Sequence, residues 1–157
     1  MIMKKRLFAA AASLMFSALS LAHDYQHHDL TIAHPWARAT PPGVTVGGGF
    51  LTIHNGSDQD ETLLGGSAPF AREVQIHETR QEGDVMKMEH RPEGLLIPAG
   101  ESRSLQPGGY HVMFMGMDSP LVDGEKVPVT LTFEHAGNID VEFAVEKRSG
   151  GMDHDMD

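Results

Sequence analysis

The segment 110–117, Tyr-His-Val-Met-Phe-Met-Gly-Met, carries the side chains with the clearest chemical potential in this chain. Its positions alternate in character, and successive side chains of a β-strand point to opposite faces. One face is then an ordinary core face, whereas the other carries His111, Met113 and Met115. Imidazole and thioether groups suit soft Cu(I), so this face is a candidate copper site.

A second region supplies side chains of the same kind. Residues 72–78 alternate as a strand with His77 on the face opposite the apolar positions, and a Glu-Gly-Asp turn follows at 82–84. The return strand places Met86 and Met88 on one face. Antiparallel pairing would bring His77 near these methionines. A single methionine is usually core filler, but ligands gathered on faces turned away from the core favour a metal site.

The rest of the chain predicts the scaffold that must position these residues. Turn sequences rich in Gly, Pro, Asn and Asp separate short alternating segments, and no segment after residue 22 predicts a helix of about ten residues. Strands are expected at residues 30–39, 47–55, 62–68, 72–78, 85–88, 95–97, 102–105, 110–115, 127–133 and 139–145. This pattern predicts an all-β sandwich or barrel, with the single tryptophan, Trp36, as a core anchor.

The first 22 residues are predicted to be a secretory signal peptide. A basic start is followed by an apolar stretch and by the small-x-small sequence Ser20-Leu21-Ala22, so cleavage is expected after Ala22. No second apolar segment suggests insertion into a membrane. The mature chain would keep nine of the 12 basic residues against 22 acidic ones, a net charge of −13. That charge argues against nucleic acid as a partner and is compatible with a metal cation.

The composition excludes several kinds of site. The chain has no cysteine, so zinc fingers, thiol nucleophiles and the cysteine-containing copper site of electron-transfer cupredoxins are excluded. No second histidine completes a zinc-protease motif after His77-Glu78, and no nucleophile elbow is present. We therefore do not expect a hydrolase. Ten histidines and, after residue 22, seven methionines remain as metal ligands.

Both ends of the mature chain also contain metal ligands. Residues 23–32 would form a leader that contains histidines, and His23 would be the new amino terminus, where its amine and imidazole can chelate Cu(II). Residues 148–157 have too little apolar mass to fold and are expected to form a flexible tail. The tail carries Met152, His154 and Met156 among aspartates, so it is a second candidate site for copper.

Five segments together resemble the periplasmic copper chaperones (PCuAC-like) that supply the CuA centre of cytochrome c oxidase. They are Pro-Trp-Ala-Arg-Ala-Thr at 35–40, His-Glu-Thr at 77–79, Val-Met-Lys-Met at 85–88, Ile-Pro-Ala-Gly at 97–100 and Pro-Gly-Gly-Tyr-His-Val-Met at 107–113. The family signature is His-x10-Met-x21-His-x-Met. Ten residues separate His77 from Met88 and one separates His111 from Met113, but 22 lie between Met88 and His111.

The resemblance implies a fold, a cargo and a set of ligands. The fold would be a cupredoxin-like Greek-key β-barrel over residues 33–147, and the cargo would be one Cu(I) held by His77, Met88, His111 and Met113. The extra residue falls within Glu89-His90-Arg91-Pro92, so it leaves Met86 as an alternative to Met88 and adds His90 as a possible ligand. The ten-residue spacing after His77 matches the family signature at Met88 and therefore favours Met88. Some family members have a Met/His-rich extension implicated in Cu(II) binding, and the tail resembles a short one.

The resemblance also implies a partner and a location. A monomeric, non-enzymatic periplasmic protein would deliver copper to subunit II of cytochrome c oxidase or to a thioredoxin-like copper assembly protein. A periplasmic protein that sequesters copper for resistance would use the same ligands, and the sequence does not separate the two. A copper redox enzyme that uses the amino-terminal His23 is a third hypothesis, but the neighbouring residues do not resemble those enzymes.

Overall fold

The computed structural model describes residues 24–147, which form eleven β-strands and no helix. The strands are β1 Tyr25–His27, β2 Leu30–Arg38, β3 Val46–Asn55, β4 Glu61–Ala68, β5 Ala71–Glu82, β6 Val85–His90, β7 Leu95–Ile97, β8 Ser102–Leu105, β9 Tyr110–Met115, β10 Lys126–Phe133 and β11 Gly137–Glu146. Every strand expected from the sequence is present. No helix within this part of the chain is long and apolar enough to cross a membrane.

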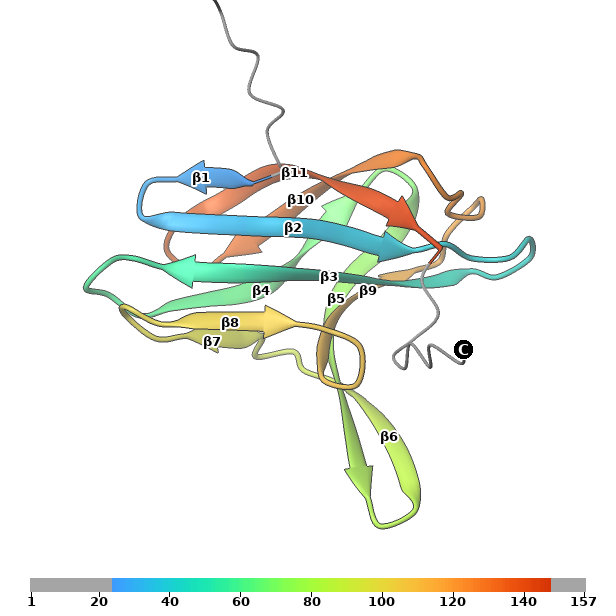
Figure 1. The fold of residues 1–157 in the computed structure, drawn as a ribbon, viewed down its shortest axis with the longest axis horizontal. Helices are drawn as coiled ribbons and strands as arrows, with labels where there is room; N and C mark the ends of the chain where they lie inside the picture. The colour runs from blue at the N-terminus through green and yellow to red at the C-terminus, as the bar shows by residue number, and fades with distance from the viewer. Residues whose placement is uncertain (1–23, 148–157) are drawn as a thin grey trace, which may run out of the picture.

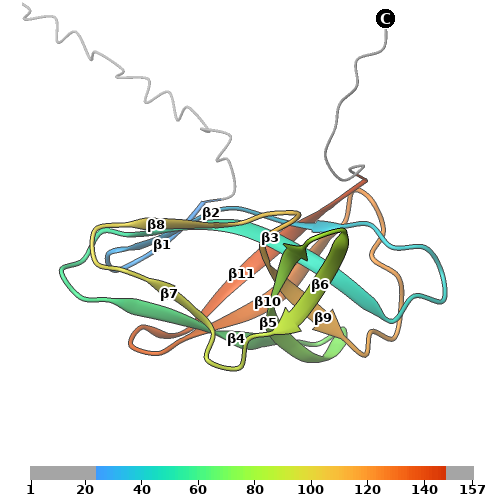
Figure 2. The ribbon, with the colours of Figure 1, turned by 90° about the horizontal axis from the view of Figure 1, so that it is seen from below.

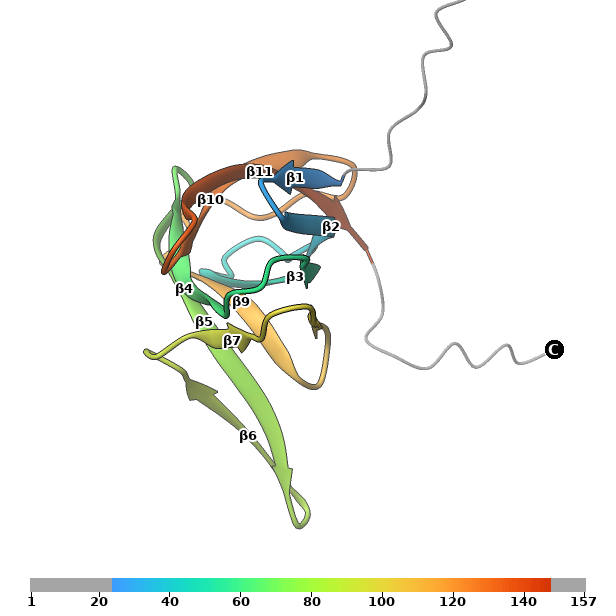
Figure 3. The same cartoon turned by 90° about the vertical axis from the view of Figure 1, so that its left-hand side faces the viewer.

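Seven of the strands close into a barrel in the order β2-β11-β10-β4-β5-β9-β3, with β3 pairing back to β2 (Figures 1 and 3). The neighbours are antiparallel except β11 and β2, which run parallel over three residue pairs. The other four strands extend individual barrel strands: β1 pairs with β2, β8 with β3, β7 with β4 and β6 with β5. The prediction of an all-β, cupredoxin-like barrel is confirmed.

One side of each barrel strand fills the interior. Alternation along the strands places every second side chain inside, where large apolar groups become fully buried. The largest of them are Phe114, Phe133, Phe143, Ile32, Ile53, Leu63, Ile76, Ile97, Leu105, Leu131, Val112 and Val129. Burial of this surface is the main force that stabilises a chain without disulfides. Met117, which follows the candidate strand, also lies in this core and is 4% exposed.

The triple glycine at the start of β3 has two different functions. Gly49 faces inward, where a Cβ atom would come within 2.6 Å of the Phe143 ring and 3.1 Å of Phe114. Gly47 also faces inward, where a Cβ atom would lie 3.2 Å from the Met117 sulfur. Gly48 points to the outer face, where a Cβ atom would make only an ordinary contact with Phe50 at 3.4 Å. The core therefore needs the first and third glycines, and the outer face has the free space beside the second.

The β5–β6 hairpin projects from the barrel wall (Figures 1, 2 and 3). β9 pairs with β5 over residues 73–78, and residues 79–82 of β5 continue outward paired with β6. Gly83 has a φ of 61°, a left-handed conformation that suits the two-residue turn between Glu82 and Val85. Arg91 forms two hydrogen bonds with the Glu78 carboxylate, at 2.9 and 2.5 Å, which fix the base of the hairpin.

The amino-terminal part of the described chain differs from the expected leader. Residues 25–27 form β1, and β2 already begins at Leu30, so much of the segment 23–32 belongs to the sheet. Tyr25 packs against the core, and its hydroxyl accepts a hydrogen bond from the Glu142 amide. The predicted signal peptide, His23 and the tail ligands Met152, His154 and Met156 lie outside the described residues.

Candidate metal site

Strand register brings the predicted ligands onto one face of three neighbouring strands. His77 on β5 pairs with His111 on β9 and with His90 on β6. Two residues before His77 on β5, Gln75 pairs with Met113 on β9. Two residues after His77, Thr79 pairs with Met88 on β6. Because directly paired residues share a face, the four predicted ligands project from the same side of the β9-β5-β6 sheet.

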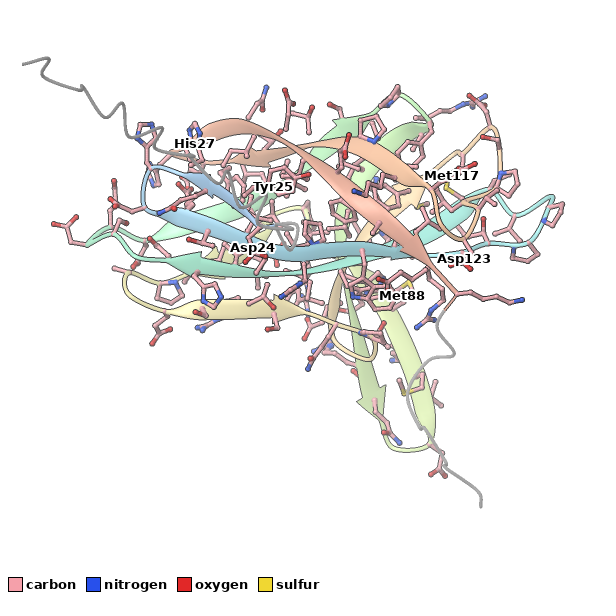
Figure 4. The ribbon with its side chains drawn as sticks, turned by 45° about the horizontal axis from the view of Figure 1, so that its top comes forward. Asp24, Tyr25, His27, Met88, Met117 and Asp123 are labelled. Carbon is pink, nitrogen blue, oxygen red and sulfur yellow. The ribbon has the colours of Figure 1, made fainter. Side chains whose placement is uncertain are left out.

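A cavity of about 210 Å³ opens on this face at the base of the hairpin. Three of the four predicted ligands, Met88, His111 and Met113, line it. The remaining lining residues are Arg38, Gly48, Phe50, Thr79, Pro107 and Gly108. Figure 4 labels Met88 where the hairpin leaves the barrel. The fourth predicted ligand, His77, lies beside the cavity, with its ring 5.8 Å from that of His111 between centroids.

The burial and hydrogen bonding of His111 suit a metal ligand. The side chain is 5% exposed, and its Nδ1–H donates to the carbonyl of Gly109 at 3.2 Å. The second ring nitrogen, Nε2, is buried without a hydrogen-bond partner. Burial lowers the pKa of His111, which favours the neutral imidazole. A buried lone pair facing a cavity with two thioethers fits a soft cation.

His77 is also held as a neutral ring. Partial burial and the neighbouring His111 and His90 rings lower its pKa, with burial the largest cause. Its Nε2 lies 2.9 Å from the Oε1 atom of Gln75. The two histidines of the site are thus each oriented by one hydrogen bond and need no deprotonation at neutral pH before they bind a metal.

A row of five rings crosses the outer face through the site. Successive centroid separations are 4.7 Å from Trp36 to Phe50, 6.4 Å to His111, 5.8 Å to His77 and 5.3 Å to His90. The expectation that Trp36 anchors the core is wrong, because its ring stacks on Phe50 on the outside of the barrel. Phe50 and the Pro107–Gly108 turn line the site with His111. The site is therefore more enclosed than a bare strand face.

The alternative ligands lie in different surroundings. Met86 pairs with Gln81 further along the hairpin, is 58% exposed and does not line the cavity. His90 is exposed and stacks on His77, also outside the cavity lining. Met115 lies beyond Met113, paired with Glu73 and Val46. Because the β5–β6 ladder is unbroken from Val85 to His90, an inserted residue fits better in the turn after His90 than in β6.

Several residues that shape the cavity have no metal-binding chemistry of their own. Gly48 lies opposite Met113 in the β3–β9 ladder and leaves the space above it open. Phe50 and Arg38 contribute walls from β3 and β2, and the Arg38 guanidinium lies 5.7 Å from the centre of the Phe50 ring. Arg38 lies in one of the segments that carry the family resemblance, whereas nothing in the sequence analysis pointed to Gly48 or Phe50.

Comparisons with known proteins agree with this architecture. Residues 30–145 match the family described as putative lipoprotein LpqE-like. The putative lipoprotein Lxx21020 of Leifsonia xyli subsp. xyli (strain CTCB07) is 30% identical over 129 residues, which cover 82% of this chain and 76% of the relative.

Two solved structures share the fold. The copper-bound PCuAC domain from PmoF2 is 27% identical, with a TM-score of 0.68 over 80% of this chain and 99% of that domain. The solution structure of CuI-DR1885 from Deinococcus radiodurans is 33% identical, with a TM-score of 0.61 over 76% and 79% of the two chains. The fold is therefore that of the PCuAC class of β-domains. The chain itself belongs to the LpqE-like family, and the PCuAC-like resemblance in the sequence is confirmed.

Proposed function

We propose that the protein is a copper chaperone that binds one Cu(I) through His77, Met88, His111 and Met113. The observation that carries the proposal is the cavity at the hairpin base, where two thioethers meet the unpartnered Nε2 of His111. The copper-bound and CuI-bound states of the two similar structures support copper as the cargo.

The donor set suits a protein that must both hold and release its cargo. Thioethers are neutral and favour Cu(I), whereas two imidazoles add affinity without the strong hold of a thiolate. Met88 is 55% exposed on the projecting hairpin, so an acceptor can reach this ligand first. Ligand exchange that begins at Met88 would let copper leave without unfolding the barrel. We assign the protein a transfer function in the periplasm rather than an enzymatic one.

The expected acceptor is subunit II of cytochrome c oxidase or a thioredoxin-like copper assembly protein. The chemistry of transfer requires an acceptor with thiolate ligands, which bind Cu(I) more strongly than thioethers and imidazoles do. The alternative is a copper-sequestering protein with the same site. Mixing the Cu(I)-loaded protein with a CuA-domain acceptor separates the two: rapid metal transfer supports the chaperone, and retention supports sequestration.

Two methionines on the same strand provide the direct test of the site. Met86 and Met88 share a face and are exposed to a similar extent, but only Met88 lines the cavity. We expect Met88→Leu to weaken Cu(I) binding by about tenfold or more, about 1.4 kcal/mol, in competition with a Cu(I) chelator. Met86→Leu is the matched control and should retain the wild-type affinity.

X-ray absorption of protein loaded with one equivalent of Cu(I) gives the ligand types directly. The wild-type protein should show a mixed shell of nitrogen and sulfur, and the sulfur contribution should disappear in the Met88→Leu/Met113→Leu double variant. A shell of nitrogen alone in the wild-type protein would move the copper away from this cavity and overturn the proposal.

A further inference from the structure

Three side chains at alternate positions of β5 form a hydrogen-bonded chain beside the cavity. The Nε2 group of Gln75 donates to the Oε2 atom of Glu73 at 2.5 Å, and the Oε1 atom of Gln75 lies 2.9 Å from Nε2 of His77. Glu73, Gln75 and His77 share one face because they are two residues apart on a strand. None of these contacts is needed to close the barrel.

The direction of each hydrogen bond in this chain follows from the group at its end. An ionised carboxylate only accepts, so Glu73 requires the amide NH₂ of Gln75 on its side. The amide oxygen of Gln75 must then face His77, and that oxygen is also only an acceptor. The Nε2 atom of His77 therefore carries the proton. In a neutral imidazole the other nitrogen, Nδ1, then keeps the lone pair.

We propose that Glu73 and Gln75 are positioning residues that select the Nε2–H tautomer of His77 and so present its Nδ1 atom to copper. This inference rests on the proposed function and adds a residue pair to it. Ligating histidines commonly donate their other N–H to an oxygen, which fixes the tautomer and the ring orientation. His111 follows the same rule with the opposite tautomer, because its Nδ1–H donates to Gly109 and Nε2 is left free.

The two histidines thus face the metal with different nitrogens, each set by a different acceptor. For His111 the acceptor is a backbone carbonyl, which is fixed by the turn before β9. For His77 the acceptor is the side-chain amide of Gln75. This amide can rotate, and without Glu73 nothing would decide whether its oxygen or its NH₂ group faces the His77 ring. The carboxylate of Glu73 therefore has a defined function although it lies outside the cavity lining.

The tautomer can be tested in the metal-free protein. Long-range ¹H–¹⁵N correlation spectra of ¹⁵N-labelled apo protein report which imidazole nitrogen carries the proton. We expect the Nε2–H form for His77 and the Nδ1–H form for His111 in the wild-type protein. In Gln75→Leu, His77 should become a mixture of tautomers while His111 stays unchanged, and in Gln75→Glu the restored acceptor should return the Nε2–H form.

Copper affinity provides the second measurement. Loss of an outer hydrogen-bond partner typically costs about 10–100-fold in metal affinity, so Gln75→Leu should weaken Cu(I) binding by at least about tenfold, with partial recovery in Gln75→Glu. Gln81→Leu is the matched control, because Gln81 lies on the same face of β5 and donates to the Gly83 carbonyl, away from His77. It should change neither the spectra nor the affinity.

Each contrary result overturns a specific step. A wild-type His77 with its proton on Nδ1 would refute the tautomer assignment whether or not the protein binds copper. A tautomer shift in Gln75→Leu without loss of affinity would refute the positioning function, and a loss of affinity without a tautomer shift would refute the mechanism. If the wild-type protein bound no Cu(I), the proposed function would fail while the spectra still tested the hydrogen-bond chain.

Discussion

His111 links the sequence motif to the chemistry of the site. Its side chain is almost fully buried, yet one ring nitrogen has no partner. A buried polar atom without a hydrogen bond costs roughly 1–3 kcal/mol. A cation in the adjoining cavity would accept this lone pair, and metal binding would therefore remove the free-energy cost of burying the unpartnered nitrogen. The His90 ring belongs to the same row but is exposed, so water can reach its nitrogen atoms.

The contrast between these histidines gives a prediction at the residue scale. His111→Ala should weaken Cu(I) binding by at least about tenfold, because His111 is the only histidine among the described residues that line the cavity, and its Nε2 is buried without a partner. His90→Ala should leave the affinity within about twofold to threefold, less than about 0.7 kcal/mol. Chelator competition gives both values, and circular dichroism checks that each variant is folded. Unchanged affinity in His111→Ala would sink the assignment of the site.

At the scale of elements, β3 shows how one strand serves both the core and the site. Its inward Gly49 lets the Phe143 and Phe114 rings approach the backbone, and its outward Gly48 keeps the space over Met113 open. The two requirements alternate because side chains of a strand alternate. Neighbouring glycines in one segment should therefore respond to substitution in different ways.

Substitutions at Gly48 and Gly49 test this division. Gly49→Ala should destabilise the protein by about 1–3 kcal/mol, because its methyl group would overlap the Phe143 ring. Gly48→Ala should stay within about 1 kcal/mol of the wild-type stability, and Gly48→Val should weaken Cu(I) binding by filling the cavity. Urea unfolding and chelator competition provide the measurements. Equal loss of stability in Gly48→Ala and Gly49→Ala would contradict the alternation.

The alternation of apolar and polar residues predicted the strands well, but it did not predict which side chains cover their outer faces. The strands that contain His77, Met88 and His111 were expected, and the pairing of the first two was correctly inferred from the turn at Gly83. That the strand of His111 pairs with the other side of β5 was not inferred from the strand pattern. The Trp36 and Phe50 rings on the outer face were not expected, because a single strand does not show which distant strand pairs beside it. β1 was missed since its three residues show no apolar alternation, and the turn before β2 places His28, rather than glycine, at a φ of 53°.

At the scale of the whole molecule, the barrel and the site depend on different contacts. The parallel pairing of Ala144–Glu146 with Trp36–Arg38 completes the barrel. The Lys147 amide then donates to Asp123 at 3.0 Å, at the end of the described chain. The cavity is lined from β2, β3, β5, β6 and β9 and the turn before β9, and it receives no residue from β10 or β11.

Truncation after Lys147 should therefore separate two kinds of copper binding. Because the described residues already contain the closed barrel and all four proposed ligands, the shortened protein should bind its first Cu(I) with wild-type affinity. It should take up less Cu(II), because Met152, His154, Met156 and the neighbouring aspartates would be absent. Chelator competition measures the first quantity, and electron paramagnetic resonance during a Cu(II) titration measures the second. A fall in Cu(I) affinity on truncation would show that the tail contributes a ligand to the primary site, whereas unchanged Cu(II) uptake would leave the amino-terminal His23 as the candidate for Cu(II).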